Sequence, residues 1–187
     1  MMQMVCSCVP YWIFVGMSPL LYMEELGVSL KHFGYYQGAQ ASVFALGSLL
    51  FGLIINRYNQ NKMLYASNYL FIGGNICIAI ITFMNSSNPL LITVSLIPCI
   101  IAYVIPSAFL YPIYLNFMPE AKGRVSATLR GTQLIFSALS LQLAGYIYRG
   151  SFQNIGILMI GFNVLAVIAL FLILKNREIM KRGEEEN

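Results

Sequence analysis

The stretch from Pro119 to Ser137, PEAKGRVSATLRGTQLIFS, joins a short charged turn to an apolar helix. Gly123 can form the turn, and Lys122 and Arg124 keep it in water. From Ser126 the helix carries polar residues at spacings of four and three, which places them on one helical face: Arg130, Gln133, Ser137 and Ser140. Unsatisfied polar groups cost several kcal/mol in hydrocarbon, so lipid would penalise this face. We therefore expect it to contact other helices or a water-filled path.

The composition of the chain is that of a membrane protein. Of its 187 residues, 58% are hydrophobic and only 10% are charged, and the mean hydropathy is +0.71. A soluble domain carries about 25% charged residues. Several apolar runs approach or exceed the ~20 residues that a helix needs to cross a bilayer. We therefore predict an all-α integral membrane protein.

The same residues argue against several classes of function. The net charge of +4 does not indicate nucleic-acid binding, because the basic residues lie in short loops and at the tail. The single histidine, His32, has no cysteine close to it in sequence, so we expect neither a metal site nor a cofactor; the cysteines are Cys6, Cys8, Cys77 and Cys99. No Ser/His/Asp set and no intramembrane pair of carboxylates is present to carry out a reaction, so we do not expect an enzyme.

Apolar spans follow one another along the chain with short connections between them. We predict six, at about residues 5–23, 33–55, 64–84, 90–116, 126–148 and 155–174. Residues 1–174 then form one six-helix transmembrane bundle, and residues 175–187 form a polar tail.

The placement of lysine and arginine predicts the orientation of this bundle. Eight of these residues lie on one side of the predicted membrane: Arg57, Lys62, Lys122, Arg124, Lys175, Arg177, Lys181 and Arg182. Lys31 and Arg149 lie on the other side, and Arg130 lies within the fifth span. Basic loops stay in the cytoplasm, so we expect both termini and the tail to be cytoplasmic, in agreement with an even number of spans.

Polar and aromatic side chains on four of the spans predict a substrate cavity. Gln37 and Gln40 lie three residues apart on the second span, and Tyr103 and Ser107 lie four apart on the fourth. The predicted cavity residues are Tyr11, Ser18, Tyr22, Gln37, Gln40, Tyr103, Ser107, Gln133 and Ser137. An aromatic cavity would suit lipophilic or cationic compounds through stacking and cation–π contacts. The alternative is that the polar groups only hold the helices together and that many of the aromatic rings form interfacial belts.

Small residues recur at four-residue spacing in the second span. The pairs are Gly34–Gly38, Gly38–Ser42, Ala41–Ala45 and Ser48–Gly52. Such spacing lets two helix backbones approach closely, so we predict a tight contact between this span and another helix. The third and sixth spans have few polar groups, and we expect them to face lipid.

The turn after the second span resembles a motif of the major facilitator superfamily, G-x-x-x-D-R-x-G-R-x-x-x-L. It reads GLIINRYNQNKML from Gly52 to Leu64, with Arg57 at the arginine, Asn56 at the acid and Asn59 at the second glycine. MPEAKGRVSATLRG, residues 118–131, is similar to the loop between helices ten and eleven of drug–proton antiporters of the Bcr/CflA type. SPLLYMEELGVSLKHFGYYQG, residues 18–38, looks like helices seven and eight of the same group.

This resemblance covers nearly the whole chain in order, and it implies the C-terminal six-helix half of a major facilitator fold. In that fold substrate binds between two six-helix halves, and alternating access moves it across the bacterial inner membrane. The implied partners are the lipid bilayer, a small-molecule substrate, and an N-terminal half or a second copy of this chain. The residues expected to act in gating are Asn56, Arg57, Glu120, Arg124 and Arg130.

The resemblance implies multidrug or small-molecule efflux, and three alternatives stay open. These are uptake of a metabolite, a non-transporting membrane scaffold, and the product of a truncated gene. Proton coupling needs a titratable group in the path, but Glu24 and Glu25 lie only at a helix end and no acid lies deeper in any span. We therefore expect that the chain does not catalyse proton antiport alone.

Overall fold

The computed structural model describes residues 2–54, 59–116 and 118–175, and the regular secondary structure of these residues is helical. The first helix, α1 (Met2–Pro19), continues as a π-helical turn, η1 (Leu20–Glu25). The other elements are α2 (Leu30–Ile54), α3 (Gln60–Phe83), α4 (Pro89–Asn116), the short 3-10 turn η3 (Pro119–Ala121), α5 (Lys122–Ile147) and α6 (Phe152–Lys175).

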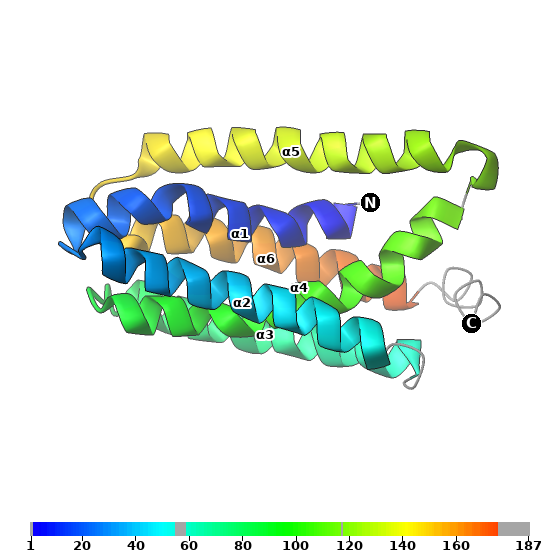
Figure 1. Cartoon of the computed structure of the whole chain (residues 1–187), viewed down its shortest axis with the longest axis horizontal. Helices are drawn as coiled ribbons and strands as arrows, with labels where there is room; N and C mark the ends of the chain where they lie inside the picture. The colour runs from blue at the N-terminus through cyan, green and yellow to red at the C-terminus, as the bar shows by residue number, and fades with distance from the viewer. Residues whose placement is uncertain (1, 55–58, 117, 176–187) are drawn as a thin grey trace.

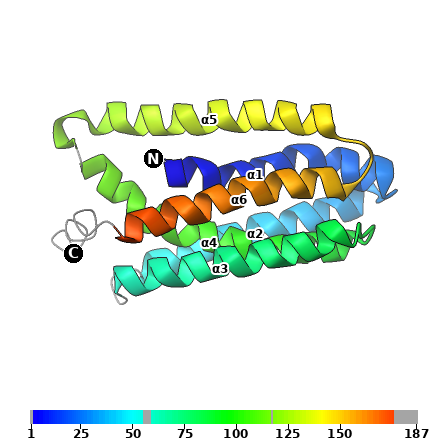
Figure 2. The same ribbon diagram turned by 180° about the vertical axis from the view of Figure 1, so that it is seen from behind.

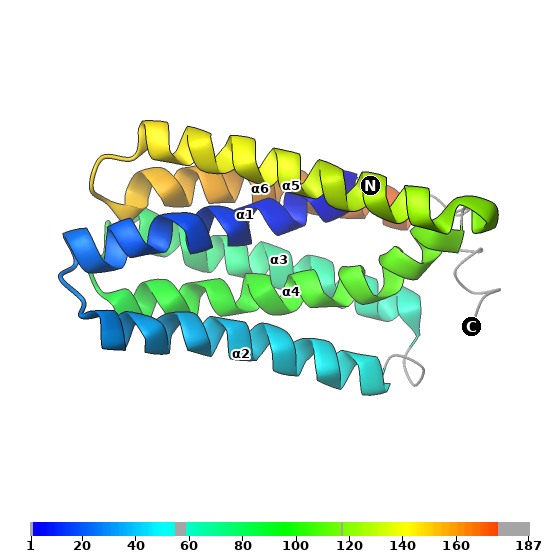
Figure 3. The ribbon, with the colours of Figure 1, turned by 45° about the horizontal axis from the view of Figure 1, so that its top comes forward.

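The long helices lie side by side in two layers. In Figure 3, α5, α1, α4 and α2 follow one another in the front layer, and α6 and α3 lie behind them. The view from behind places α6 and α3 in front (Figure 2). The α6 helix packs against α1 and α3, and α3 packs against α4, while α5 packs mainly on α1 and α2 mainly on α4. The two outermost helices of the front layer, α2 and α5, therefore each pack against one main neighbour.

The six predicted spans are confirmed only in part. Six long helices lie close to the predicted positions in the described residues, but only four of them are long and apolar enough to cross a membrane. These are Met2–Glu25, Lys62–Phe83, Pro89–Asn116 and Phe152–Lys175. The other two helices carry the polar residues of the front layer: α2 contains Gln37 and Gln40, and α5 contains Arg130 and Gln133.

Both described ends of the chain lie at the same end of the bundle. Met2 opens α1 and Lys175 closes α6 at the right of Figure 1, beside the turn that joins α4 to α5. Lys122 and Arg124 lie at this end, whereas Lys31, the second residue of α2, lies at the other. The described chain therefore begins and ends at the end of the bundle that carries Lys122 and Arg124.

Two apolar clusters fill the bundle, one toward each end. One contains Val9, Ile13, Tyr22, Ile92, Phe152 and their neighbours, and the other contains Met4, Phe71, Phe109, Leu129, Leu170 and their neighbours. The outward faces of α3 and α6 are apolar as well, with Ile76, Ile80, Leu165 and Ile168 among their exposed residues. This agrees with the expectation that these two helices face lipid, although α6 also turns Asn163 inward, where it is 1% exposed.

The predicted close contact of the small residues on α2 is wrong within the described chain. A Cβ atom built at Gly34, Gly38 or Gly52 meets no atom of the described residues within 4 Å. Ala41, Ser42, Ala45 and Ser48 are exposed. The close approaches lie elsewhere. A Cβ atom at Gly74 of α3 would overlap Cys99 of α4, and one at Gly156 of α6 would overlap Thr82 of α3.

Candidate functional site

A cavity of about 360 Å³ opens between the four helices of the front layer. Its volume falls in the range of pockets that hold small organic ligands, roughly 300–1,000 Å³. It is lined by Cys8, Tyr11 and Trp12 of α1, Phe44 of α2, Tyr103 of α4, and Arg130, Gln133 and Leu134 of α5. The lining combines aromatic rings with one cation and one amide.

Three aromatic rings from three helices form the apolar wall of this cavity. The rings of Tyr11 and Phe44 are stacked with centroids 6.3 Å apart and an interplanar angle of 21°. Phe44 stacks in turn on Tyr103, at 6.2 Å and 18°. Trp12 meets Tyr11 edge-on at 5.8 Å. Offset stacking of this kind is favourable beyond the area that it buries, so α1, α2 and α4 together hold one extended aromatic surface.

Arg130 supplies the positive charge of the cavity. Its Nη1 donates a hydrogen bond of 3.1 Å to Gln133 Oε1, and its guanidinium carbon lies 5.2 Å from the ring centroid of Tyr111. Gln133 Nε2 donates to the carbonyl oxygen of Met4 at 3.2 Å, and the hydroxyl of Tyr111 lies 2.8 Å from Ser126 Oγ. The cation is therefore positioned by neutral groups of α4 and α5, and α1 in turn fixes Gln133.

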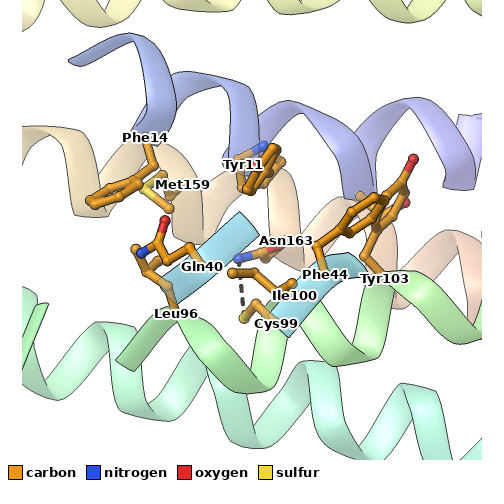
Figure 4. Close-up of a pocket in the computed structure, with 12 residues that line it drawn as sticks. Tyr11, Phe14, Gln40, Phe44, Leu96, Cys99, Ile100, Tyr103, Met159 and Asn163 are labelled. Carbon is orange, nitrogen blue, oxygen red and sulfur yellow. Dashed lines mark hydrogen bonds between the residues drawn. The ribbon is translucent and has the colours of Figure 1, made fainter. Parts of the chain in front are cut away.

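A smaller cavity of about 30 Å³, room for a water molecule, adjoins the first. The two share the walls Tyr11, Phe44 and Tyr103, and Gln40 and Asn163 supply polar groups to the smaller one (Figure 4). Both side chains are 1% exposed. The Nδ2 of Asn163 donates to Cys99 Sγ at 3.8 Å. Neither amide atom of Gln40, nor Asn163 Oδ1, has a hydrogen-bond partner among the described residues.

Both cavities lie near the middle of the helices that form them. Tyr11 lies halfway along the continuous helix Met2–Glu25, and Tyr103 halfway along α4. Phe44 and Asn163 lie close to the centres of α2 and α6. Helices of this length match the ~30 Å of a bilayer core, so a bilayer crossed by these helices would have the cavities near its midplane.

The structure brings together only some of the residues predicted for the cavity. Tyr11, Gln40, Tyr103 and Gln133 line one or both of these cavities. The polar face predicted for the fifth span is buried at Gln133, Ser137 and Ser140, whereas Arg130 on the same face is exposed. Ser137 lies behind the cavity wall, with its Oγ 3.9 Å from Cys8 Sγ.

The other predicted cavity residues lie outside these two cavities. Gln37 donates a short hydrogen bond to Ser18, which ties α2 to α1. Tyr22 is buried in the apolar core, and its hydroxyl lies 2.7 Å from Thr93 Oγ1. Ser107 donates to the carbonyl oxygen of Val104 in its own helix. The bonds of Gln37 and Tyr22 join different helices, which is the alternative stated for them above, whereas Ser107 bonds only within α4.

The structure describes three of the five predicted gating residues. Glu120 and Arg124 are exposed in and after η3. No ion pair joins Glu120 to Arg130, and both residues lie in the described part of the chain. Asn56 and Arg57 lie outside the described residues. The gating role of all five therefore stays a prediction.

Several cavity residues were missed from the sequence. Phe44 follows Gln40 by one helical turn and so shares its face, but it is one of twelve phenylalanines and carries no polar signal. Asn163 is the one strongly polar residue within the sixth span, and that isolation was a signal for an inward position. Trp12 and Cys8 occupy positions with no distinguishing spacing.

Comparison with known proteins identifies the family. The model of the Major Facilitator Superfamily matches residues 1–187, the whole chain. A search of curated proteins and a search of solved structures each gave no match. The apolar helices and this match together identify an integral membrane protein of a transporter family. A family model that covers every residue is decisive for membership, and the chain belongs to the major facilitator superfamily.

Proposed function

We propose that this chain forms the C-terminal six-helix half of a small-molecule efflux transporter that works by alternating access, with α1, α2, α4 and α5 lining the path. The three-ring stack of Tyr11, Phe44 and Tyr103 in a cavity of about 360 Å³ carries this proposal. It lies at mid-membrane depth, where transporters bind their substrates. The likeness of residues 118–131 to the Bcr/CflA-type drug–proton antiporters supports efflux over uptake.

The proposal includes a partner and an orientation. The front layer, α5–α1–α4–α2, would face an N-terminal six-helix half, while the apolar faces of α3 and α6 contact lipid. Residues 1–174 would then be the transmembrane bundle and residues 175–187 a cytoplasmic tail. The basic residues at the end that holds Lys122 and Arg124 support a cytoplasmic location for both termini in a bacterial inner membrane.

A transport assay with a neutral aromatic probe tests this function. Cells expressing the chain alone, or together with an N-terminal six-helix half, would be loaded with dansylamide, and its loss on energising the membrane would be followed by fluorescence. We expect extrusion with the partner present. Loss of one stacking ring in Phe44→Ala should slow extrusion about three- to tenfold.

Phe171→Ala is the matched control, since Phe171 is 55% exposed on α6 and does not line the cavities. It should leave extrusion unchanged. Extrusion by the chain alone would favour a pair of copies over a separate N-terminal half. Absence of extrusion in both arms, together with no saturable binding of dansylamide to the purified chain, would contradict the proposed transport and favour a scaffold.

A further inference from the structure

No acid among the described residues pairs with the positive charge of Arg130. The sequence holds seven acidic residues, all glutamates, at positions 24, 25, 120, 178, 184, 185 and 186. Of these, Glu24, Glu25 and Glu120 belong to the described residues, and none of the three lines the cavity that contains Arg130. Arg130 lies eight residues into α5, or about 12 Å along the helix axis. Inserting such a charge toward the centre of a bilayer costs about 2.5–3.5 kcal/mol.

The surroundings of Arg130 fix its position without neutralising it. Gln133 accepts a hydrogen bond from Nη1, and the ring of Tyr111 lies under the guanidinium. Both partners are neutral. A guanidinium has five N–H donors in a planar fork, and a carboxylate or sulfonate can accept two of them in parallel. The contacts of Arg130 therefore leave guanidinium N–H donors that an anionic ligand could bind.

The charge of Arg130 also limits what can bind beside the aromatic stack. A cationic compound would be repelled at short range, and no carboxylate among the described lining residues offsets that repulsion. The cationic compounds suggested by the aromatic composition are thus disfavoured. An anion with a flat apolar body can instead place its charge at Arg130 and its body along the rings of Tyr11, Phe44 and Tyr103.

The smaller cavity extends this argument to the other end of the ligand. Gln40 and Asn163 lie beyond the shared aromatic wall, are 1% exposed, and keep amide atoms without a partner among the described residues. A buried unsatisfied amide costs free energy, about 1–3 kcal/mol, until it finds a partner. A small neutral polar group, such as a hydroxyl or an amide, would supply one in a space of about 30 Å³.

We propose that the substrate of this cavity is an amphipathic organic anion: a carboxylate or sulfonate held by Arg130, a flat apolar middle on the aromatic stack, and a neutral polar group toward Gln40 and Asn163. This inference rests on the proposed function, because it names the substrate class of the same cavity. It adds a requirement for negative charge that the function itself does not contain.

The chain carries its own reporter for this binding. Trp12 is its single tryptophan and lines the cavity. The purified full chain, in a non-ionic detergent, would be titrated with dansyl sulfonate and with dansylamide, which share the ring system and differ in charge. Energy transfer from Trp12 to the dansyl group reports occupancy of the cavity. We expect the sulfonate to bind about tenfold more tightly, as charge-assisted hydrogen bonds would give.

Variants of Arg130 separate charge from shape. Arg130→Gln should remove the preference for the sulfonate, while dansylamide binds as before within about twofold. Arg130→Lys should keep part of the preference, since it retains the charge and loses the planar fork. Arg149→Gln removes the same charge from the exposed loop after α5 and should keep the full preference. The two probes partition differently into micelles. Comparing the ratio of their two dissociation constants between variants cancels this difference.

The possible outcomes keep the two proposals apart. Equal binding of the two probes to the wild-type chain, or an unchanged preference in Arg130→Gln, would overturn the anion proposal and leave the transport proposal standing. Failure of both probes to bind saturably would overturn both. If Arg130→Gln does not purify as a monodisperse protein, two other measurements test the anion proposal. One is the preference of Arg130→Lys for the sulfonate, and the other is competition on the wild-type chain between the non-fluorescent pair 2-naphthoate and 2-naphthamide. Inorganic sulfate at equal concentration should not displace dansyl sulfonate, and if it does, the rings contribute nothing and the proposal fails.

Discussion

At the scale of single residues, the glycine contacts mark where the helices are closest. A Cβ atom at Gly156 of α6 would overlap Thr82 of α3. We expect Gly156→Ala to push these helices apart and to lower the free energy of unfolding by about 1–3 kcal/mol, the usual cost of overpacking. Thermal unfolding in detergent, followed by circular dichroism, measures this loss.

Gly161→Ala on the same helix is the control for that substitution. A Cβ atom at Gly161 meets nothing within 4 Å among the described residues. Both changes replace glycine by alanine inside α6, so they share the gain in helix propensity of about 1 kcal/mol. Equal midpoints for the two variants would show that α3 and α6 are not in contact at Gly156.

Tyr148, in the loop after α5, predicts how stability changes at alkaline pH. Burial raises the pKa of Tyr148 above its usual value, and the carboxylates of Glu25 and Glu24 add to the increase. A group whose pKa is raised by folding stabilises the protein below its unfolded pKa, about 10 for tyrosine. That contribution is lost as the pH rises through the folded pKa.

Tyr148→Phe should therefore lose less stability than the wild type between pH 9 and pH 11. Its hydroxyl has no hydrogen-bond partner among the described residues, so the substitution should cost little at neutral pH. Thermal midpoints of both proteins across this range, in the same detergent, provide the test. Parallel curves would mean that Tyr148 ionises equally easily in the folded and unfolded chain.

At the scale of elements, α5 shows what periodicity can predict and what it cannot. The spacing of Arg130, Gln133, Ser137 and Ser140 predicted one polar face turned away from lipid, and all of these but Arg130 are buried. Spacing fixes the face of a helix but not the neighbour that it meets. That α1 would be this neighbour, through the carbonyl of Met4, follows only from the packed bundle.

In α2, spacing predicted a helix contact that the described chain does not make. Its small residues have the spacing of a close helix contact, yet Gly38 and Ala45 are exposed and the described chain brings no helix against them. The residue of α2 that completes the aromatic stack, Phe44, has no distinctive spacing or charge. Small size permits close approach without requiring it, and an aromatic ring in an apolar helix looks the same in sequence whether it faces lipid or a cavity.

The contact between α5 and α1 leads to a prediction at this scale. Gln133 donates to the Met4 carbonyl and accepts from Arg130. Gln133→Leu removes both hydrogen bonds, and we expect it to destabilise the bundle by about 0.6–2 kcal/mol, as measured for polar contacts between membrane helices. Gln142→Leu, at an exposed position of α5, should not lower the thermal midpoint. A similar loss in both variants would mean that Gln133 does not join the two helices.

At the scale of the whole molecule, both layers expose large apolar side chains, including Leu49 of α2 and Leu139 of α5, but they differ in what they line. The back layer presents apolar side chains such as Ile76 and Leu165, which suits lipid. The front layer contains the cavity, the cation and the small residues of α2. Family membership and the six long helices followed from the sequence, because hydropathy and motifs are local. The position of the cavity did not, because it depends on four helices meeting at one depth.

This difference between the layers predicts where water reaches the protein. Ser48 lies one turn after Phe44 on α2 and is exposed, and Ile76 is 55% exposed on α3. In a background whose four native cysteines are replaced by alanine, Ser48→Cys and Ile76→Cys would be treated in membranes with a charged, impermeant thiosulfonate. The thiolate is the reactive form and requires water, so Ser48→Cys should react at least about tenfold faster. Equal protection of both would mean that α2 faces lipid or another protein, and the front layer would then not line a water-filled path.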